Sequence, residues 1–218
     1  MGIWQIDHRD PDVVELGNSD PKMERLIQYI GDIEVEMRTD YFLSITRSII
    51  GQLISSKAAD TIFTRLEALL HGDISALSIS NLTEEELRAV GMPKRKAAYI
   101  HSLAQEVSTG SLVLSRLQDL SNEQAVLQLT NIKGIGRWTA EMFLIFSLGR
   151  KDVLALDDVG LQRGAKWLYQ VPDGERRRIL AAKSKLWHGH YTIASFYLWE
   201  AVHHNLVSQP LTIEELKL

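Results

Sequence analysis

The pattern that most restricts the fold of this chain is a succession of helix start and stop signals with almost no strand-like alternation. Asp20-Pro21 is typical of a helix N-terminus, because proline is favoured at the first helical position, and Gly31 ends the segment that follows. A longer helical pattern covers residues 41–70 and is interrupted at residues 51–56, where a glycine and two serines weaken helix formation. The Leu-Val-Leu run at 112–114 is the best strand candidate, although a turn or another helix is the preferred interpretation. The sequence therefore predicts an all-α fold.

Further segments show capping residues or apolar residues at helical spacing. Thr83 followed by three glutamates predicts a capped helix start, and Gly91-Met-Pro ends that helix. The remaining predicted helices cover residues 94–107, 121–129, 137–148, 159–169, 174–186 and 191–206. No internal repeat, low-complexity tract or long linker separates them. We therefore expect a single module over residues 1–218.

The composition limits the class of protein and its compartment. A chain of 218 residues is long enough for one sizeable core or for two small lobes that share a groove. The absence of cysteine excludes a disulfide framework, cysteine-ligated zinc and an iron–sulfur cluster held by this chain. There is no N-terminal signal pattern, and no apolar run approaches the roughly 18 residues that span a bilayer. We expect a soluble, intracellular protein of the cytoplasm or nucleoid that does not associate with membranes.

The charge of the chain is unevenly distributed. The formal net charge is −4, but residues 1–40 carry a net charge of −6 and the remaining residues carry +2. The acidity is therefore local, and a basic face on the rest of the chain is compatible with the composition. This small positive balance does not predict nucleic-acid binding by itself.

A short glycine-containing turn lies between two predicted helices, in the stretch Leu-Thr-Asn-Ile-Lys-Gly-Ile-Gly-Arg-Trp at 129–138. Gly134 and Gly136 permit a tight turn, and the next helix begins at once, so that its free N–H groups point outward. Such a helix N-terminus binds anions, and a DNA phosphate is one candidate. An ordinary helix connection is the alternative. The preceding Ile132 and the aromatic residue at 138 favour the helix–hairpin–helix motif of DNA-binding proteins.

Two adjacent carboxylates, Asp157 and Asp158, precede the predicted helix at 159–169. Either one could cap that helix, which is the simplest interpretation. An aspartate near a bound phosphodiester would experience like-charge repulsion, so stability alone would not place it beside a DNA-binding turn. Together with the turn, the pair favours a catalytic carboxylate that also caps its helix.

These residues together resemble the helix–hairpin–helix superfamily of base-excision DNA glycosylases, most closely the 3-methyladenine DNA glycosylases of type II, which act in alkylation repair. The matching stretches are GQLISSKAA (51–59), GMPKRKAAYI (91–100), residues 132–164, and WHGHYTIASFYLWEAV (187–202). They lie within roughly residues 40–205. The resemblance implies two helical lobes that flank a DNA-binding cleft, with lobe one at about 40–148 and lobe two at about 1–39 plus 149–218.

The resemblance also assigns roles to individual residues. It makes Asp158 the catalytic carboxylate and leaves Asp157 a structural role. Leu53, which follows Gln52, is expected to enter the duplex where a nucleotide is flipped out, with core packing as the alternative. The expected DNA-contacting residues are Gln52, Leu53, Ile132, Lys133, Gly134, Ile135, Gly136, Arg137 and Thr139.

Further expected sites are a base pocket and a cation site. The pocket residues are Trp138, Met142, Trp187, His190 and Tyr191, and for Trp187 plain core packing is an equal alternative. The backbone carbonyls of Thr130, Ile132 and Ile135 are expected to hold a monovalent cation, as in relatives. The basic run Lys94-Arg95-Lys96 is interpreted as a solvated face, with phosphate contact as the alternative. Surface or pocket positions are preferred over metal ligation for His188, His190, His203 and His204.

The implied activity is a monofunctional glycosylase that hydrolyses the N-glycosidic bond of alkylated purines. Relatives that also cleave the strand carry a nucleophilic lysine where this chain has Trp138. No cofactor is required for hydrolysis, and the expected partner is damaged double-stranded DNA bound by a monomer. Gly189, His190 and Tyr191 depart from the usual family pattern and leave the substrate range open. The alternatives are another lesion preference within the same fold, or a non-catalytic DNA-binding module.

Overall fold

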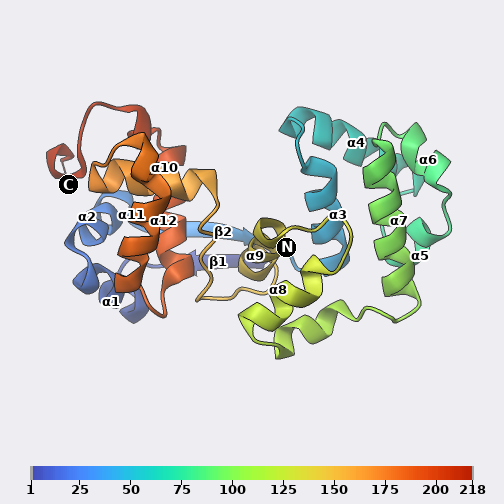
Figure 1. Cartoon of the computed structure of the whole chain (residues 1–218), viewed down its shortest axis with the longest axis horizontal. Helices are drawn as coiled ribbons and strands as arrows, with labels where there is room; N and C mark the ends of the chain where they lie inside the picture. Colours follow the sequence, from blue (N-terminus) through green and yellow to red (C-terminus); the bar gives the residue numbers. More distant parts are fainter. Residues whose placement is uncertain (1, 218) are drawn as a thin grey trace. The chain divides into compact units, whose positions relative to one another are not determined.

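The computed structural model describes residues 2–217, which form helices and one two-stranded sheet (Figure 1). The chain divides into two compact units. One, here called the central unit, comprises residues 38–148, and the other, the terminal unit, combines the residues up to Met37 with those from Gly149 onward. The prediction of an essentially all-α fold is confirmed. No helix among the described residues is long and apolar enough to cross a membrane.

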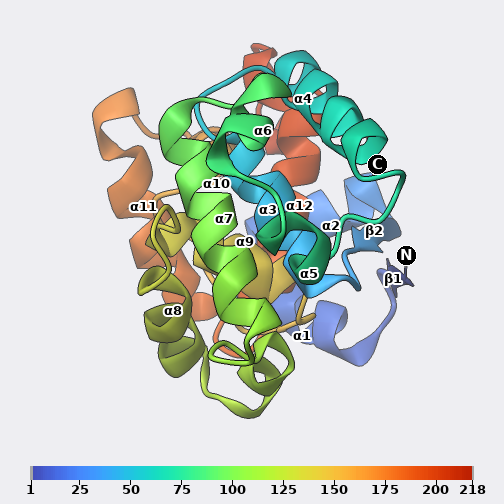
Figure 2. The same ribbon diagram turned by 90° about the vertical axis from the view of Figure 1, so that its right-hand side faces the viewer.

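The central unit contains α-helices and one short 3-10 segment. Its elements are α3 (Tyr41–Gly51), α4 (Ser56–Leu69), α5 (Ala76–Ser80), α6 (Glu84–Ala89), α7 (Lys94–Ser108), η1 (Leu114–Asp119), α8 (Asn122–Thr130) and α9 (Arg137–Phe146). Helix α7 packs against both α3 and α5 (Figure 2). Helix α4 packs against α3, and Ile49 in α3, Leu66 in α4 and Ile100 in α7 are fully buried. The unit therefore has its own hydrophobic core.

Capping interactions place several of these helices where the sequence predicts them. Thr83 and Glu86 form a reciprocal capping box at the start of α6, and Ser121 and Gln124 form another at α8. The predicted interruption at residues 51–56 is confirmed by the end of α3 and the start of α4. The 112–114 run leads into the 3-10 segment η1 rather than a strand. Side-chain caps thus determine where most of the α-helices in this unit begin.

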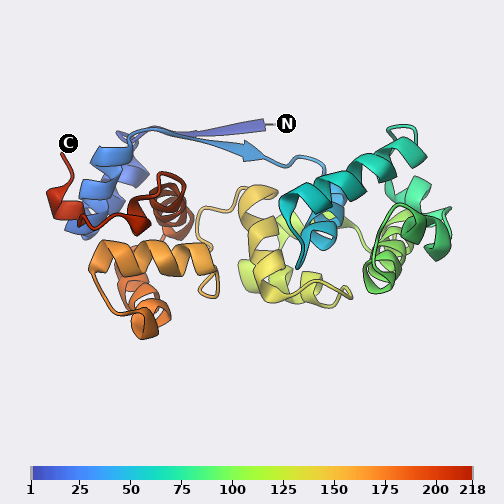
Figure 3. The ribbon, with the colours of Figure 1, turned by 90° about the horizontal axis from the view of Figure 1, so that it is seen from above.

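The terminal unit joins the two ends of the chain. Its elements are β1 (Gly2–Ile6), α1 (Pro11–Ser19), α2 (Pro21–Ile30), β2 (Ile33–Met37), α10 (Val159–Tyr169), η2 (Asp173–Glu175), α11 (Arg176–Lys183), η3 (Ser184–Leu186), α12 (Tyr191–His203), η4 (Leu206–Ser208) and η5 (Ile213–Glu215). Strands β1 and β2 lie side by side, as Figure 3 shows from above. They pair antiparallel, with Trp4 opposite Val35. Helix α10 packs against both α11 and α12.

Three features of this unit differ from the sequence prediction. The two strands were not predicted, although Ile33-Glu-Val-Glu-Met alternates between buried and exposed positions, because each strand is only five residues long. Helix α1 was not predicted either, although Pro11 stands at its first position just as Pro21 does in α2. The segment predicted as one helix at 174–186 is divided between η2, α11 and η3.

A buried carboxylate, Asp20, connects three parts of the terminal unit. One oxygen caps α2 by accepting the N–H groups of Lys22 and Met23. The other accepts the hydroxyl of Tyr169 at 2.5 Å and the indole N–H of Trp187 at 3.1 Å. Burial and the neighbouring Asp20 charge raise the pKa of the Tyr169 hydroxyl, which stays protonated and donates. Asp20 therefore fixes α2, the end of α10 and the segment before α12 together.

The Asp20→Ala substitution should lower the free energy of unfolding by at least about 3 kcal/mol, because two buried donors and a helix cap lose their acceptor. The matched control is Asp40→Ala, which removes an exposed cap of α3 and should cost about 1 kcal/mol. Urea unfolding measures both values. Equal losses would contradict a central role for Asp20.

Candidate active site and nucleic-acid interface

Asp158 is the N-cap residue of α10 and is 8% exposed. Its Oδ1 accepts the backbone N–H of Leu161 at 2.8 Å and the indole N–H of Trp199 at 3.0 Å. The expected capping role is therefore confirmed. Because both donors approach the same oxygen from fixed elements, the orientation of the carboxylate is determined by α10 and α12. A negative charge at this position is also favoured by the positive end of the helix dipole.

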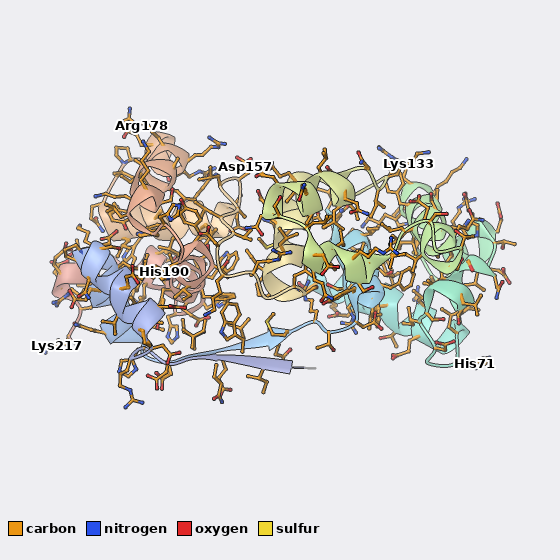
Figure 4. The ribbon with its side chains drawn as sticks, turned by 90° about the horizontal axis from the view of Figure 1, so that it is seen from below. His71, Lys133, Asp157, Arg178, His190 and Lys217 are labelled. Carbon is orange, nitrogen blue, oxygen red and sulfur yellow. The ribbon has the colours of Figure 1, made fainter. Side chains whose placement is uncertain are left out.

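The neighbouring Asp157 lies in a different environment. Its carboxylate is exposed and accepts a hydrogen bond from Nε of Arg177 at 2.8 Å (Figure 4). This ion pair joins the loop before α10 to the start of α11. Two adjacent aspartates thus have separate surroundings, and only Asp158 is both buried and held by directed donors.

The contact between Trp199 and Asp158 was not predicted from the sequence. Trp199 lies in α12 and also packs against Phe196, with ring centroids 5.8 Å apart. Gly160 leaves room for this pair, since a Cβ atom there would lie 3.0 Å from Asp158 Oδ1 and 3.1 Å from Trp199 Cδ1. An aromatic residue in an apolar helix is usually a core residue, so no signal in the sequence indicates this role.

The glycine-containing turn joins α8 to α9 in the central unit. Gly134 has φ = +90°, a conformation that favours glycine, and Gly136 is the N-cap residue of α9 without a side-chain cap. Ile132 and Ile135 are buried, and the side chain of Lys133 projects outward (Figure 4). The first N–H groups of α9 therefore stand at an exposed turn, which is the arrangement that binds anions.

Two other expected DNA-contacting residues of this turn are engaged within the protein. The guanidinium of Arg137 binds Glu123 at 2.6 Å and Glu141 at 2.9 Å. The side chain of Thr139 is buried. These contacts engage both side chains within the protein, whereas the first backbone N–H groups of α9 have no side-chain cap.

Leu53 occupies the turn between α3 and α4, and its side chain is fully exposed. Its backbone has φ = +57°, which leucine rarely adopts. The alternative of core packing is therefore excluded. The neighbouring Gln52 donates its side-chain N–H to the carbonyl of Gly134 at 2.9 Å, so the Leu53 turn and the glycine turn are joined within one unit.

The expected base-pocket residues have different surroundings. Trp138 is half-exposed at the start of α9, and Met142 is buried one turn later. In the terminal unit, the His190 ring lies 3.5 Å from a Glu15 carboxylate oxygen, and Tyr191 begins α12. These four assignments stay predictions.

Trp187 requires a correction. Its ring is 0% exposed and its indole N–H donates to Asp20, so it offers no face to a base. It is a core residue of the terminal unit, which was the stated alternative.

The remaining ion-binding expectations concern the glycine turn and the histidines. The carbonyl of Ile132 accepts the N–H of Ile135 at 3.1 Å, and Thr130 is the last residue of α8. Binding of a monovalent cation by these carbonyls stays a prediction. Across residues 2–217, the one group of side chains close enough together to share a metal is Asp7, His8 and Asp32. The four C-terminal histidines at 188, 190, 203 and 204 form no such group there.

The comparison with known proteins defines the class of this chain. Residues 46–188 match the HhH-GPD superfamily of base excision DNA repair proteins, and the chain belongs to this superfamily. It is 31% identical over 193 residues to DNA-3-methyladenine glycosylase 1 of Schizosaccharomyces pombe, an alignment that covers 86% of this chain and 85% of the relative. The resemblance inferred from the motifs is thereby confirmed.

Solved structures agree with this assignment. A DNA-3-methyladenine glycosidase from Bacillus halodurans superposes with a TM-score of 0.90 and 36% identity, covering 97% of this chain and 98% of that one. The Schizosaccharomyces pombe 3-methyladenine DNA glycosylase Mag1, in complex with abasic DNA, gives a TM-score of 0.77 and 30% identity, covering 89% and 97%.

The Gly134→Ala substitution should lower the free energy of unfolding by about 1–3 kcal/mol, because the added Cβ would lie 2.3 Å from the Tyr99 ring at a positive φ. The control is Gly136→Ala, where φ is −88° and no atom lies within 4 Å of the added Cβ. Thermal or urea unfolding compares the two variants. If Gly134→Ala were as stable as its control, the packing assigned to Tyr99 would be wrong.

Proposed function

We propose that this chain is a monofunctional DNA glycosylase that excises alkylated purines of the 3-methyladenine and 7-methylguanine type from double-stranded DNA, leaving an abasic site for base excision repair. The observation that carries the proposal is the buried Asp158 carboxylate, fixed by Leu161 and Trp199. Support comes from the relatives that are named 3-methyladenine DNA glycosylases and from the one bound to abasic DNA. The proposed enzyme acts as a monomer on DNA inside the cell.

The proposed reaction breaks the bond between C1′ of the sugar and the purine nitrogen. Alkylation at N3 or N7 places a positive charge on the purine, which therefore leaves with the bonding electron pair as a neutral base without prior protonation. The sugar acquires oxocarbenium character, and the fixed carboxylate of Asp158 stabilises that charge. A water molecule then adds to C1′ and releases its proton, with the carboxylate as acceptor.

Two elements of the central unit have proposed roles in presenting the nucleotide. The exposed Leu53 would occupy the space left in the base stack when the nucleotide is flipped out. The N–H groups at the start of α9 would bind a backbone phosphate without a basic side chain. Trp138 stands where strand-cleaving relatives carry a nucleophilic lysine, so the proposed enzyme forms no Schiff base from this position.

The half-exposed Trp138 is the proposed stacking surface for the flipped base. A cationic base is attracted to the face of an indole ring, which favours alkylated over normal purines. The pattern around His190 and Tyr191 is the proposed origin of differences in lesion preference from other family members.

The direct test is release of purine bases from methylated DNA by the wild-type protein and by Asp158→Asn. Asparagine still caps α10 and accepts both hydrogen bonds, so the fold should persist while the negative charge is lost. We expect the single-turnover rate to fall by roughly 10²–10³-fold, as when one transition-state-stabilising group is removed. Chromatographic identification of the released bases measures the rate and the lesion preference together.

The matched control is Asp157→Asn, which removes the neighbouring charge and its ion pair with Arg177 but should leave base release close to wild type. A wild-type protein that binds duplex DNA without releasing any base would identify a non-catalytic module instead. Strand cleavage without added alkali would overturn the monofunctional assignment.

A further inference from the structure

The C-terminal end of α3 is held by a lysine from another helix. Nζ of Lys96, in α7, donates to the carbonyl of Ile50 at 2.7 Å and to the carbonyl of Gln52 at 2.5 Å. The last carbonyls of a helix have no partner within the helix, and a cation at this end is also favoured by the helix dipole. Lys96 is half-buried in this position, so its charge is directed into the protein. The exposed neighbour Lys94 makes no such contact among the hydrogen bonds of the described residues.

The turn that Lys96 holds is unfavourable by itself. Leu53 follows Gln52 directly, adopts a left-handed backbone conformation and exposes its whole side chain. A non-glycine residue in this conformation costs of order 1–3 kcal/mol and persists only where its surroundings impose it. Gln52, which precedes Leu53, is fixed by the Lys96 hydrogen bond to its carbonyl, by the bond from its side chain to Gly134 and by its N–H, which donates to the carbonyl of Ile49 at 3.4 Å. The second Lys96 hydrogen bond holds the carbonyl of Ile50, two residues earlier.

The same face of α7 also supports the glycine turn. The ring of Tyr99, three residues after Lys96, occupies the space beside Gly134 that a Cβ atom would need. Residues three apart lie on one face of a helix. One helical face therefore contacts both the Leu53 turn and the glycine turn within the central unit.

We propose that Lys96 is a positioning residue that holds the Leu53 turn in the conformation required for nucleotide flipping, rather than a residue that contacts DNA phosphates. The proposal rests on the proposed glycosylase function, in which Leu53 enters the base stack. It replaces, for Lys96, the interpretation of the basic run at 94–96 as a solvated face, because Lys96 is half-buried and hydrogen-bonded whereas Lys94 is exposed. Substitution of Lys96 should therefore impair nucleotide flipping, and the general affinity for DNA should change little.

The test compares Lys96→Met with Lys94→Met on two duplexes that each contain one 7-methylguanine, either paired with cytosine or mismatched with adenine. Flipping a paired base costs more than flipping a mismatched one, so a positioning defect should affect the paired substrate more strongly. We expect Lys96→Met to lower the single-turnover rate on the paired duplex by roughly tenfold, equivalent to one charge-assisted hydrogen bond, and to affect the mismatched duplex much less. Lys94→Met should leave the ratio of the two rates unchanged.

A double-mutant cycle with Leu53→Ala makes the assignment specific. If Lys96 acts through Leu53, adding Lys96→Met to Leu53→Ala should lower the paired rate by no more than about twofold further, since the two residues are coupled. Lys96→Arg retains a cationic donor and should keep most of the wild-type ratio, which guards against a misfolded methionine variant. Equal losses on both duplexes, or additive losses in the cycle, would overturn the proposal.

Amide hydrogen exchange provides a readout that does not depend on activity. Without DNA, Lys96→Met should speed exchange over residues 51–55, whereas Lys94→Met should leave exchange there unchanged. A wild-type protein that releases no base would refute the glycosylase function, and the exchange result would then decide whether Lys96 holds the turn. Unchanged exchange in Lys96→Met would refute the positioning role even in an active enzyme.

Discussion

The orientation of the Asp158 carboxylate in the terminal unit depends on two hydrogen bonds that Oδ1 accepts. One donor is the backbone of α10 and the other is the indole of Trp199 in α12. Capping and the proposed catalysis use the same carboxylate, because a helix N-terminus both needs an acceptor and favours a negative charge. Gly160 keeps the space beside this pair open, so the packing of α10 against α12 determines where the charge lies.

Helix ends also provide the elements proposed to contact DNA in the central unit. The start of α9 leaves N–H groups without a side-chain cap, and the end of α3 leads into the exposed Leu53. Both features are unfavourable for an isolated fold, since one leaves donors unpaired and the other exposes apolar surface. Helix α7 supports both turns, since Lys96 holds the last carbonyls of α3 and the Tyr99 ring packs beside Gly134.

The sequence predicted the helices because their limits depend on local residues, such as the capping boxes at Thr83 and Ser121. It did not predict the two five-residue strands, whose alternation is too short to stand out from helical patterns. The role of Asp158 as a cap followed from its position, but the Trp199 contact depends on how α12 packs against α10. Trp187 was predicted as a pocket residue from its place in a family motif. Its indole N–H instead donates to the buried Asp20, which is distant in sequence. Residues whose roles depend on tertiary packing are those that sequence reasoning missed.

The most direct test of the central claim is the single-turnover rate of base release by Trp199→Phe, measured at saturating protein on methylated duplex DNA. Phenylalanine keeps an aromatic ring in α12 but removes the N–H that orients the Asp158 carboxylate. Loss of this hydrogen bond should lower the rate by roughly tenfold, with duplex affinity and thermal stability close to wild type. An unchanged rate, or a loss explained entirely by weaker DNA binding, would contradict the account that Asp158 acts as a carboxylate held in a fixed orientation.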